Sequence, residues 1–301
     1  MLVNKNSISA VFVNLKATFN KAFAAAPSVW QEVAMKVVST TSETSYVWFG
    51  RFPAMRKWIG QKHTKQLEAH KYSIVNDDFE VDVEVDRNDI EDDQLGIYGP
   101  QAEMAADSAK RLPDQLVATL MSNGFTTPCY DTQYFYDTDH EVAGNSVSNK
   151  GTAVLSIATL AAAQASYGAA RTALRSMKDE EGDSLNVTPN ILAVPPALED
   201  VANTLMTADR LEDGKANIYK GTAKVVVMPG LKTDTEWHLI DTTKPVKPFI
   251  LQVRKEPVFV SMTDMNSDLV YSLKKFRFGA EARMAVGYAF WQLAYGSTGQ
   301  G

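Results

Sequence analysis

The chain has little of what covalent or metal chemistry requires. Among 301 residues there is one cysteine, Cys129, and there are four histidines. A single thiol excludes an internal disulfide and any metal site with several cysteine ligands, and it fits a reducing compartment. Cys129 follows a Thr-Thr-Pro sequence, and we expect it to be an unreactive thiol.

Long apolar runs and an excess of positive charge are also missing. No apolar run approaches the roughly 20 residues that span a bilayer, so we expect no membrane contact. AFAAAPS at 22–28 resembles a signal-peptidase site, but polar residues interrupt the preceding segment, so we expect it to belong to the mature protein. The net charge of −6 and the pI of about 5.3 exclude a broad basic face that would hold nucleic acid.

Hydrophobic residues make up 45% of the chain, which is enough to form a substantial buried core in one or two domains. The first candidate element is an amphipathic helix that begins near Ser7 or Ser9 and ends before Pro27. Its apolar positions recur every three or four residues and include Phe12, Leu15, Phe19 and Phe23. Either the chain's own core or another subunit must cover this face.

A basic segment and an acidic strip follow one another. Residues 51–71 have a net charge of +5, and aromatic side chains alternate there with Arg51, Arg56, Lys57, Lys62 and Lys65. Because glycine and proline break this segment into short pieces, we expect a long hairpin rather than a platform for stacking bases. The return strand FEVDVEVD places Glu80, Asp82, Glu84 and Asp86 on one side, and residues 77–93 hold ten acids and one arginine. A calcium site is conceivable, but the D-x-D-x-D-G spacing is absent, and a solvated face is the commonest meaning of such a charge run. The two charged segments could pair between copies of the chain.

Helices are expected in the middle of the chain and strands towards its end. A long helix is predicted up to Gly124, and Pro113 predicts either a kink or a helix that begins there. A second helix is predicted at 159–178, a strand at 190–196, a helix at 197–206 and a strand at 223–230. From residue 236 onward the chain alternates like a series of strands, including LVYSLKKFRFG at 269–279. This order predicts an α+β fold.

The letters GDSL at 182–185 are those that name a family of serine esterases. A nucleophilic Ser184 would need a histidine base and an acid, and Asp137 and His140 have a D-x-x-H spacing that such enzymes use. Their order along the chain is reversed, and a polar helix tail precedes the motif where an apolar strand is needed. We therefore favour a turn in which Gly182 is a helix C-cap.

His140 has two acidic neighbours, Asp137 and Asp139, and these three side chains could ligate a metal. They form a loose set with no fourth ligand in sight, so a structural turn is the favoured interpretation. We predict no catalytic residue, no metal and no cofactor.

Five blocks of sequence, taken together and in order, resemble the Mu-like phage major head subunit family. They are WFGRFPAMRKWIG, YSIVNDDFEVDVEVDRNDIEDDQLGIYG, YDTQYFYDTDHEVAGN, GDSLNVTPNILAVPPALEDVANTLM and FRFGAEARMAVGYAFWQLAYGS, and they cover most of the chain from about residue 45. The resemblance implies the Hong Kong 97-type major capsid fold. It assigns residues 1–44 to an N-terminal arm, 45–95 to an extended E-loop with its return strand, 96–149 to the spine helix and the first part of the peripheral domain, 150–248 to the axial domain and 249–301 to the second part of the peripheral domain.

The resemblance implies a structural protein of the virion and no enzyme. Copies would form pentamers and hexamers of an icosahedral shell around double-stranded DNA, in the bacterial host cytoplasm, with scaffold, portal and decoration or protease proteins as partners. The subunit-interface residues expected on this basis are Phe12, Leu15, Phe19, Phe23, Arg51, Arg56, Lys57, Trp58, Lys62, Lys65, Glu80, Asp82, Glu84 and Asp86. The alternatives are a host-derived nanocompartment shell of the same fold and an esterase that uses Ser184.

Overall fold

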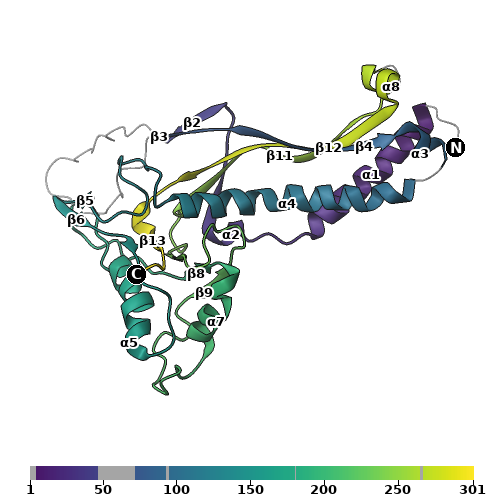
Figure 1. Ribbon diagram of the computed structural model, residues 1–301. Coiled ribbons are helices and arrows are strands. Elements are labelled where there is room, and N and C mark those ends of the chain that lie inside the picture. The colour runs from purple at the N-terminus through teal and green to yellow at the C-terminus, as the bar shows by residue number, and fades with distance from the viewer. Residues whose placement is uncertain (1–4, 47–71, 93–94, 180, 265–266) are drawn as a thin grey trace.

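The computed structural model describes residues 5–46, 72–92, 95–179, 181–264 and 267–301. Figure 1 shows a long arm in which helix α4 (Tyr98–Asn123) runs beneath an extended sheet, and a second unit that hangs from one end of that arm. Helices and strands are both abundant, which confirms the α+β prediction. No helix within these residues is long and apolar enough to cross a bilayer.

The sheet of the arm has four strands in the order β1 (Ala34–Val38), β11 (Phe249–Met262), β12 (Lys275–Tyr288) and β4 (Asp77–Asp86). β1 is parallel to β11, and the other pairs are antiparallel. Apolar side chains alternate along β4 and β12, as the sequence predicted for the first of these strands. The sheet therefore has one face against α4 and one polar face.

Residues 269–273, predicted as strand, are helical instead. They belong to α8 (Asp268–Leu273), whose first turn is capped by the Ser267 hydroxyl, which accepts a hydrogen bond from the Val270 N–H. Lys274 ends the helix in the left-handed region, with φ of 55°. A cap and a stop at these two positions outweigh the strand-like composition between them.

Helix α4 confirms the predicted long helix that ends at Asn123 and Gly124. It continues through Pro113, which is buried, so the alternative that the helix begins at this residue is wrong. Packing on both sides outweighs the loss of one backbone hydrogen bond, which in an exposed helix costs about 3 kcal/mol. The short helix α3 (Arg87–Glu91) and a 3₁₀ turn, η1 (Leu95–Ile97), lead into α4.

The second unit contains a five-stranded sheet in the order β7 (Lys150–Gly151), β13 (Ala294–Ser297), β10 (Trp237–Ile240), β8 (Ile191–Val194) and β9 (Lys224–Val227). The helix predicted at 159–178 is present as α5 (Leu160–Ala163), the π turn η2 (Gln164–Gly168) and α6 (Ala169–Arg175). After β8 come the 3₁₀ turn η3 (Pro196–Leu198) and helix α7 (Glu199–Thr207). β13 was expected with the strands of 249–301 in the peripheral domain, but it pairs with β10 in this sheet.

Shorter elements complete the described chain. They are α1 (Lys5–Ala25), α2 (Trp30–Val33), β2 (Glu43–Tyr46), β3 (Tyr72–Val75), β5 (His140–Val142), β6 (Asn145–Val147) and the 3₁₀ turn η4 (Trp291–Leu293).

The buried side chains form two separate clusters. The larger, which we call the proximal core, lies around the five-stranded sheet and the adjoining end of α4, and it contains Trp237, Trp291, Tyr136, Tyr167 and Tyr288. The smaller, which we call the distal core, lies at the far end of the arm and is built from α1, α3, α4, α8, β4, β11 and β12. Each end of the arm is thus held by its own core.

Candidate subunit-interface surfaces

Helix α1 packs on its own chain rather than presenting its apolar face to a neighbour. The rings of Phe12 and Phe276 lie edge to face with centroids 6.2 Å apart, and those of Phe19 and Phe259 are 5.6 Å apart. Phe12, Leu15 and Phe19 are 4%, 6% and 1% exposed. In this conformation the chain itself covers these three side chains, and their place in a subunit interface stays a prediction.

A row of small side chains on α4 makes this close packing possible. Ala102, Ala105, Ala106 and Ala109 are buried in the distal core, which α4 shares with α1 and the sheet. Phe23, near the end of α1, is only half-buried, and the Lys110 ammonium lies 4.9 Å from its ring centroid. Of the four predicted residues in α1, Phe23 alone retains surface that another subunit could contact.

The segment after α1 is anchored to α4 by one carboxylate. Asp114 Oδ1 accepts hydrogen bonds from the Ser28 hydroxyl at 3.0 Å, the Val29 N–H at 2.9 Å and the Trp30 N–H at 2.7 Å. Charge-assisted hydrogen bonds of this kind are stronger than those between neutral groups. Sequence reasoning missed this anchor, since an acid after a proline in a helix carries no signal of its partner 84 residues away.

The acidic strip of β4 is partly used within the chain. Glu84 forms ion pairs with Lys275 and Arg277 on the neighbouring strand, and hydrogen bonds from these two cations lower the pKa of its carboxyl. Asp86 caps α3 by accepting a hydrogen bond of 2.8 Å from the Asn88 N–H. These two residues have structural roles that the sequence did not indicate.

Glu80 and Asp82 remain available on the polar face. Both are exposed, and within the described part of the chain neither has a cationic partner. Opposite Glu80 in the sheet stands Glu281, which is paired with Lys255 at 2.6 Å. Opposite Asp82 stands Gly279, which has no side chain to shield it. Of the four predicted acids of β4, Glu80 and Asp82 are therefore the two whose charge stays unpaired within the described residues.

The predicted basic residues cannot be placed. Arg51, Arg56, Lys57, Trp58, Lys62 and Lys65 lie outside the described residues.

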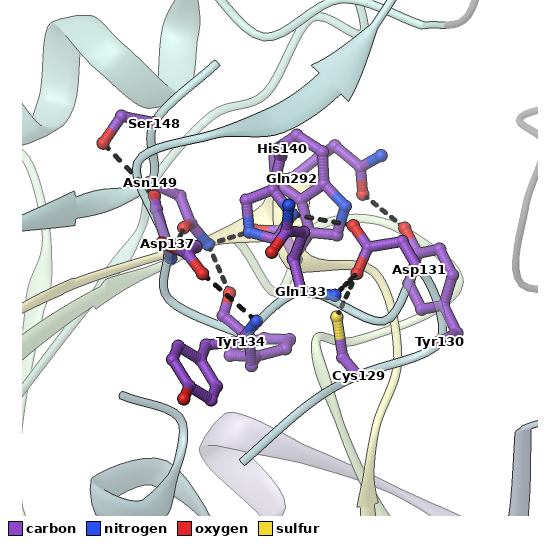
Figure 2. A network of polar contacts seen from close by, with 12 residues as sticks. Cys129, Tyr130, Asp131, Gln133, Tyr134, Asp137, His140, Ser148, Asn149 and Gln292 are labelled. Carbon is purple, nitrogen blue, oxygen red and sulfur yellow. Dashed lines mark hydrogen bonds and ion pairs between the residues drawn. The ribbon is translucent and has the colours of Figure 1, made fainter. Parts of the chain in front are cut away.

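His140 belongs to a buried polar network that joins two turns to the proximal core (Figure 2). Its ring stacks on Trp291 with centroids 3.9 Å apart, and its Nδ1 lies 2.7 Å from Asp131 Oδ2. The other Asp131 oxygen accepts hydrogen bonds from the Cys129 thiol and the Gln133 N–H. Burial raises the pKa of Asp131, but the bonds from His140 and Cys129 outweigh it and the pKa is lowered.

The contacts of this network are those of a structural turn. Both oxygens of Asp137 accept backbone N–H groups, from Tyr134 and Thr138, and Asp139 is exposed. No group of three or more His, Cys, Asp and Glu side chains in the described residues is arranged to hold a metal ion. Cys129 is buried, and burial raises the pKa of its thiol, so a reactive thiolate is not available there.

Ser184 lies in an exposed turn, and in the part of the chain that the structure describes no histidine contacts its hydroxyl. Its hydroxyl accepts a hydrogen bond of 3.2 Å from the Asn186 N–H, while the histidine proposed as its base is buried against Trp291. Gly182 has φ of 87° within a turn that Asp179 closes through its contacts to the Glu181 and Asp183 N–H groups. Since α6 ends at Arg175, Gly182 is a turn residue and not the helix C-cap that the sequence suggested.

The chain is similar to known proteins over almost its whole length. The pattern of the family described as Mu-like prophage major head subunit gpT matches residues 8–162, 151–231 and 228–300. The major capsid protein of Escherichia phage Mu is 32% identical over 299 residues, which cover 99% of this chain and 76% of that protein. The Mu-like prophage FluMu major head subunit of Haemophilus influenzae is 31% identical, with coverages of 99% and 75%.

Solved capsid structures share the fold. The procapsid of bacteriophage JBD30 matches 98% of this chain and 76% of its own, with 31% identity and a TM-score of 0.61. A virus-like particle from Pyrococcus furiosus covers 95% of this chain and 98% of its own at 9% identity, with a TM-score of 0.58, which indicates the fold alone. The chain belongs to the Mu-like prophage major head subunit family, with the Hong Kong 97-type capsid fold, and is a structural capsid protein rather than an enzyme.

Proposed function

We propose that copies of this chain associate as pentamers and hexamers into an icosahedral shell that encloses double-stranded DNA. The observation that carries this proposal is the long arm of α4 and the four-stranded sheet, in a chain that matches the JBD30 procapsid subunit over 98% of its residues. A long arm offers a large contact surface for a subunit of this size, and head-to-tail contacts close into rings when their rotation permits. A shell can enclose DNA without a positively charged inner surface, so the net charge of −6 is compatible with this function.

The finer expectations belong to the same proposal. Assembly would take place in the bacterial host cytoplasm with scaffold, portal and protease proteins. A decoration protein is a further partner, supported by the JBD30 capsid, which is described as decorated with minor capsid protein trimers. The domain divisions at residues 44, 95, 149 and 248 are retained as a proposal, apart from the transfer of β13 to the sheet of the axial domain.

The nanocompartment alternative shares the fold, but no observation favours it. The Pyrococcus particle supports the architecture at 9% identity and does not decide what is enclosed.

Imaging the purified protein tests the proposal. Negative-stain micrographs should contain closed shells or rings of five and six subunits after concentration at low and moderate salt. Protein that stays monomeric under all of these conditions, and in the presence of a co-expressed scaffold protein, would contradict it.

For the contact between subunits, we propose that the basic segment of one copy meets Glu80 and Asp82 of another. Exposed ion pairs contribute only about 0 to 1 kcal/mol each and are screened beyond about 10 Å at 0.1 M salt. A shell repeats every contact many times, so small energies become decisive. Glu84 and Asp86 are excluded from this contact because their carboxylates already serve the chain itself.

Reversing charges tests this contact. The double variant Arg56→Glu/Lys57→Glu should slow or block assembly, and adding Glu80→Lys/Asp82→Lys should partly restore it. Lys16→Glu/Lys21→Glu, on the exposed face of α1, is the matched control with the same change in charge. Assembly of the first variant at the wild-type rate across a salt titration would remove this contact from the proposal.

A further inference from the structure

A ribbon of two short strands flanks residues 47–71 in the sequence. β2 and β3 pair over four residues, from Glu43 opposite Val75 to Tyr46 opposite Tyr72. A two-stranded ribbon is marginally stable by itself, so its direction must be fixed by other contacts. Those contacts lie where the ribbon meets β11 and β12.

Gln252 holds both strands of the ribbon at once. This side chain is fully buried in β11, in the middle of an otherwise apolar run. Its Oε1 accepts a hydrogen bond of 2.8 Å from the Tyr46 hydroxyl on β2. Its Nε2 donates to the Asn76 Oδ1 at 2.8 Å and to the Ile74 carbonyl at 3.1 Å, at the end of β3.

Asn76 extends this network to the turn that starts the ribbon. It is 5% exposed, and its Nδ2 lies 2.9 Å from the Thr41 carbonyl and 3.1 Å from the Ser39 hydroxyl. Its backbone N–H donates to the Ser42 carbonyl at 3.0 Å. The segments before and after residues 47–71 are thereby tied to each other and to the central strand of the sheet.

An apolar contact on β12 seats the same ribbon. A Cβ atom on Gly287 would lie 2.2 Å from Ile74 Cδ1, so Ile74 occupies the space that a side chain at residue 287 would need. Beside it, the Tyr72 hydroxyl accepts a hydrogen bond of 3.0 Å from the Tyr288 N–H. Ribbon and sheet are therefore matched in shape as well as in polarity.

We propose that Gln252 and Asn76 are positioning residues that set the direction of the β2–β3 ribbon, which leads into residues 47–71, and through it the geometry of the contact between subunits. The proposal rests on the proposed role of that segment in assembly. Buried amides with every partner in place favour one arrangement, because any other leaves polar groups unpaired away from water. Burial, and then the proximity of Tyr72, raise the pKa of Tyr46 to about 12, so its hydroxyl stays a donor up to strongly alkaline pH.

The test compares two buried glutamines, each of which accepts a hydrogen bond from a tyrosine hydroxyl. Gln252→Leu removes the bonds to both strands, and Tyr46→Phe removes only one of them. Gln292→Leu is the matched control, because Gln292 is buried and accepts a hydrogen bond of 3.1 Å from Tyr130, which belongs to neither strand of the ribbon. The readouts are amide hydrogen exchange of unassembled subunits in peptides 40–46 and 72–76, and the rate and diameter of shells in micrographs.

We expect Gln252→Leu to raise exchange in these two peptides by about tenfold or more, to leave α4 unchanged, and to give misshapen or slowly formed shells. Tyr46→Phe should show the same pattern more weakly and carries the test if Gln252→Leu does not fold. Gln292→Leu should assemble normally. Unchanged exchange at the ribbon, or raised exchange with shells of normal rate and diameter, would overturn the proposal. Wild-type protein that forms no shells would defeat the proposed function instead, while the exchange data would still decide whether Gln252 holds the ribbon.

Discussion

The two cores at opposite ends of the arm differ in how they are closed. The proximal core combines tryptophan and tyrosine rings with many aliphatic side chains, all from elements that follow α1. The distal core depends on α1, which supplies Ile8, Val11, Phe12, Leu15 and Phe19 to cover the phenylalanines of β11 and β12. One end of the arm therefore completes itself, whereas the other needs a single helix from the start of the chain.

Deleting residues 1–26 should have the largest effect. If residues 1–26 packed on a neighbouring subunit, as the sequence allowed, their deletion would leave a soluble, folded subunit. The structure reverses this prediction, since Phe259, Phe276 and Phe278 would lose their cover and the truncated chain should aggregate. Size-exclusion chromatography and binding of a hydrophobic dye would measure this. A monomeric product with native hydrogen exchange in β12 would show that the distal core does not depend on α1.

Matched phenylalanine truncations sharpen the comparison. Phe19→Ala in the distal core and Phe135→Ala in the proximal core each remove a fully buried ring, and each should cost about 3 to 5 kcal/mol. If the cores unfold separately, Phe19→Ala should lower only the unfolding free energy reported by exchange in α1 and in residues 275–280 of β12. If both variants shift a single common transition equally, the arm is one cooperative unit.

Acid should weaken the proximal core through His238. Burial lowers the pKa of this side chain to about 3, even though a Glu236 oxygen lies 4.0 Å from its Nε2. Between about pH 6.5 and 3 the unfolded chain binds a proton that the folded chain does not, so stability should fall by roughly 1.4 kcal/mol per unit as the pH drops. His238→Gln should flatten this dependence in urea titrations. Tyr136→Phe removes the hydrogen-bond partner of His238 and should keep the slope.

The smallest expected effect concerns the surface of the distal end. The lowered pKa of Glu84 means that its pairs with Lys275 and Arg277 stabilise the fold above its unfolded pKa and are lost as the pH falls through the folded value. Glu84→Gln should reduce the melting temperature slightly at low salt and leave it unchanged at 1 M salt. The control Asp209→Gln should show the same two results, because Asp209 is also an exposed acid in an ion pair. A large loss that persists at high salt would indicate a role other than ion pairing.

Periodicity predicted the elements that bury one face. The stripes of α1, of α4 and of β4 are regular enough to be found in the sequence, and their observed bounds agree with the predicted ones within a few residues. Periodicity does not reveal which surface covers a stripe. The apolar face of α1 fits a neighbour and an intramolecular site equally well until Phe276 and Phe278 are known to lie beneath it.

The polar anchors were not predictable from the sequence because their partners are distant along the chain. Gln252 lies 206 residues from Tyr46, and Asp114 lies 84 residues from Trp30. A single glutamine inside the apolar run FILQV was the only local sign that a polar group is needed there. The letters GDSL show the opposite case, in which a local match to an enzyme motif belongs to a turn and has no chemical role.

The anchor at Asp114 also sets how far α1 can travel. Only Ala26 and Pro27 separate the end of the helix from the pinned Ser28, a span of roughly 10 Å when fully extended. A helix held on so short a tether faces its own docking site at an effective concentration on the order of millimolar or higher, and it rebinds there before a neighbouring subunit can capture it. Exchange of α1 between subunits therefore requires the three hydrogen bonds to Asp114 to break first.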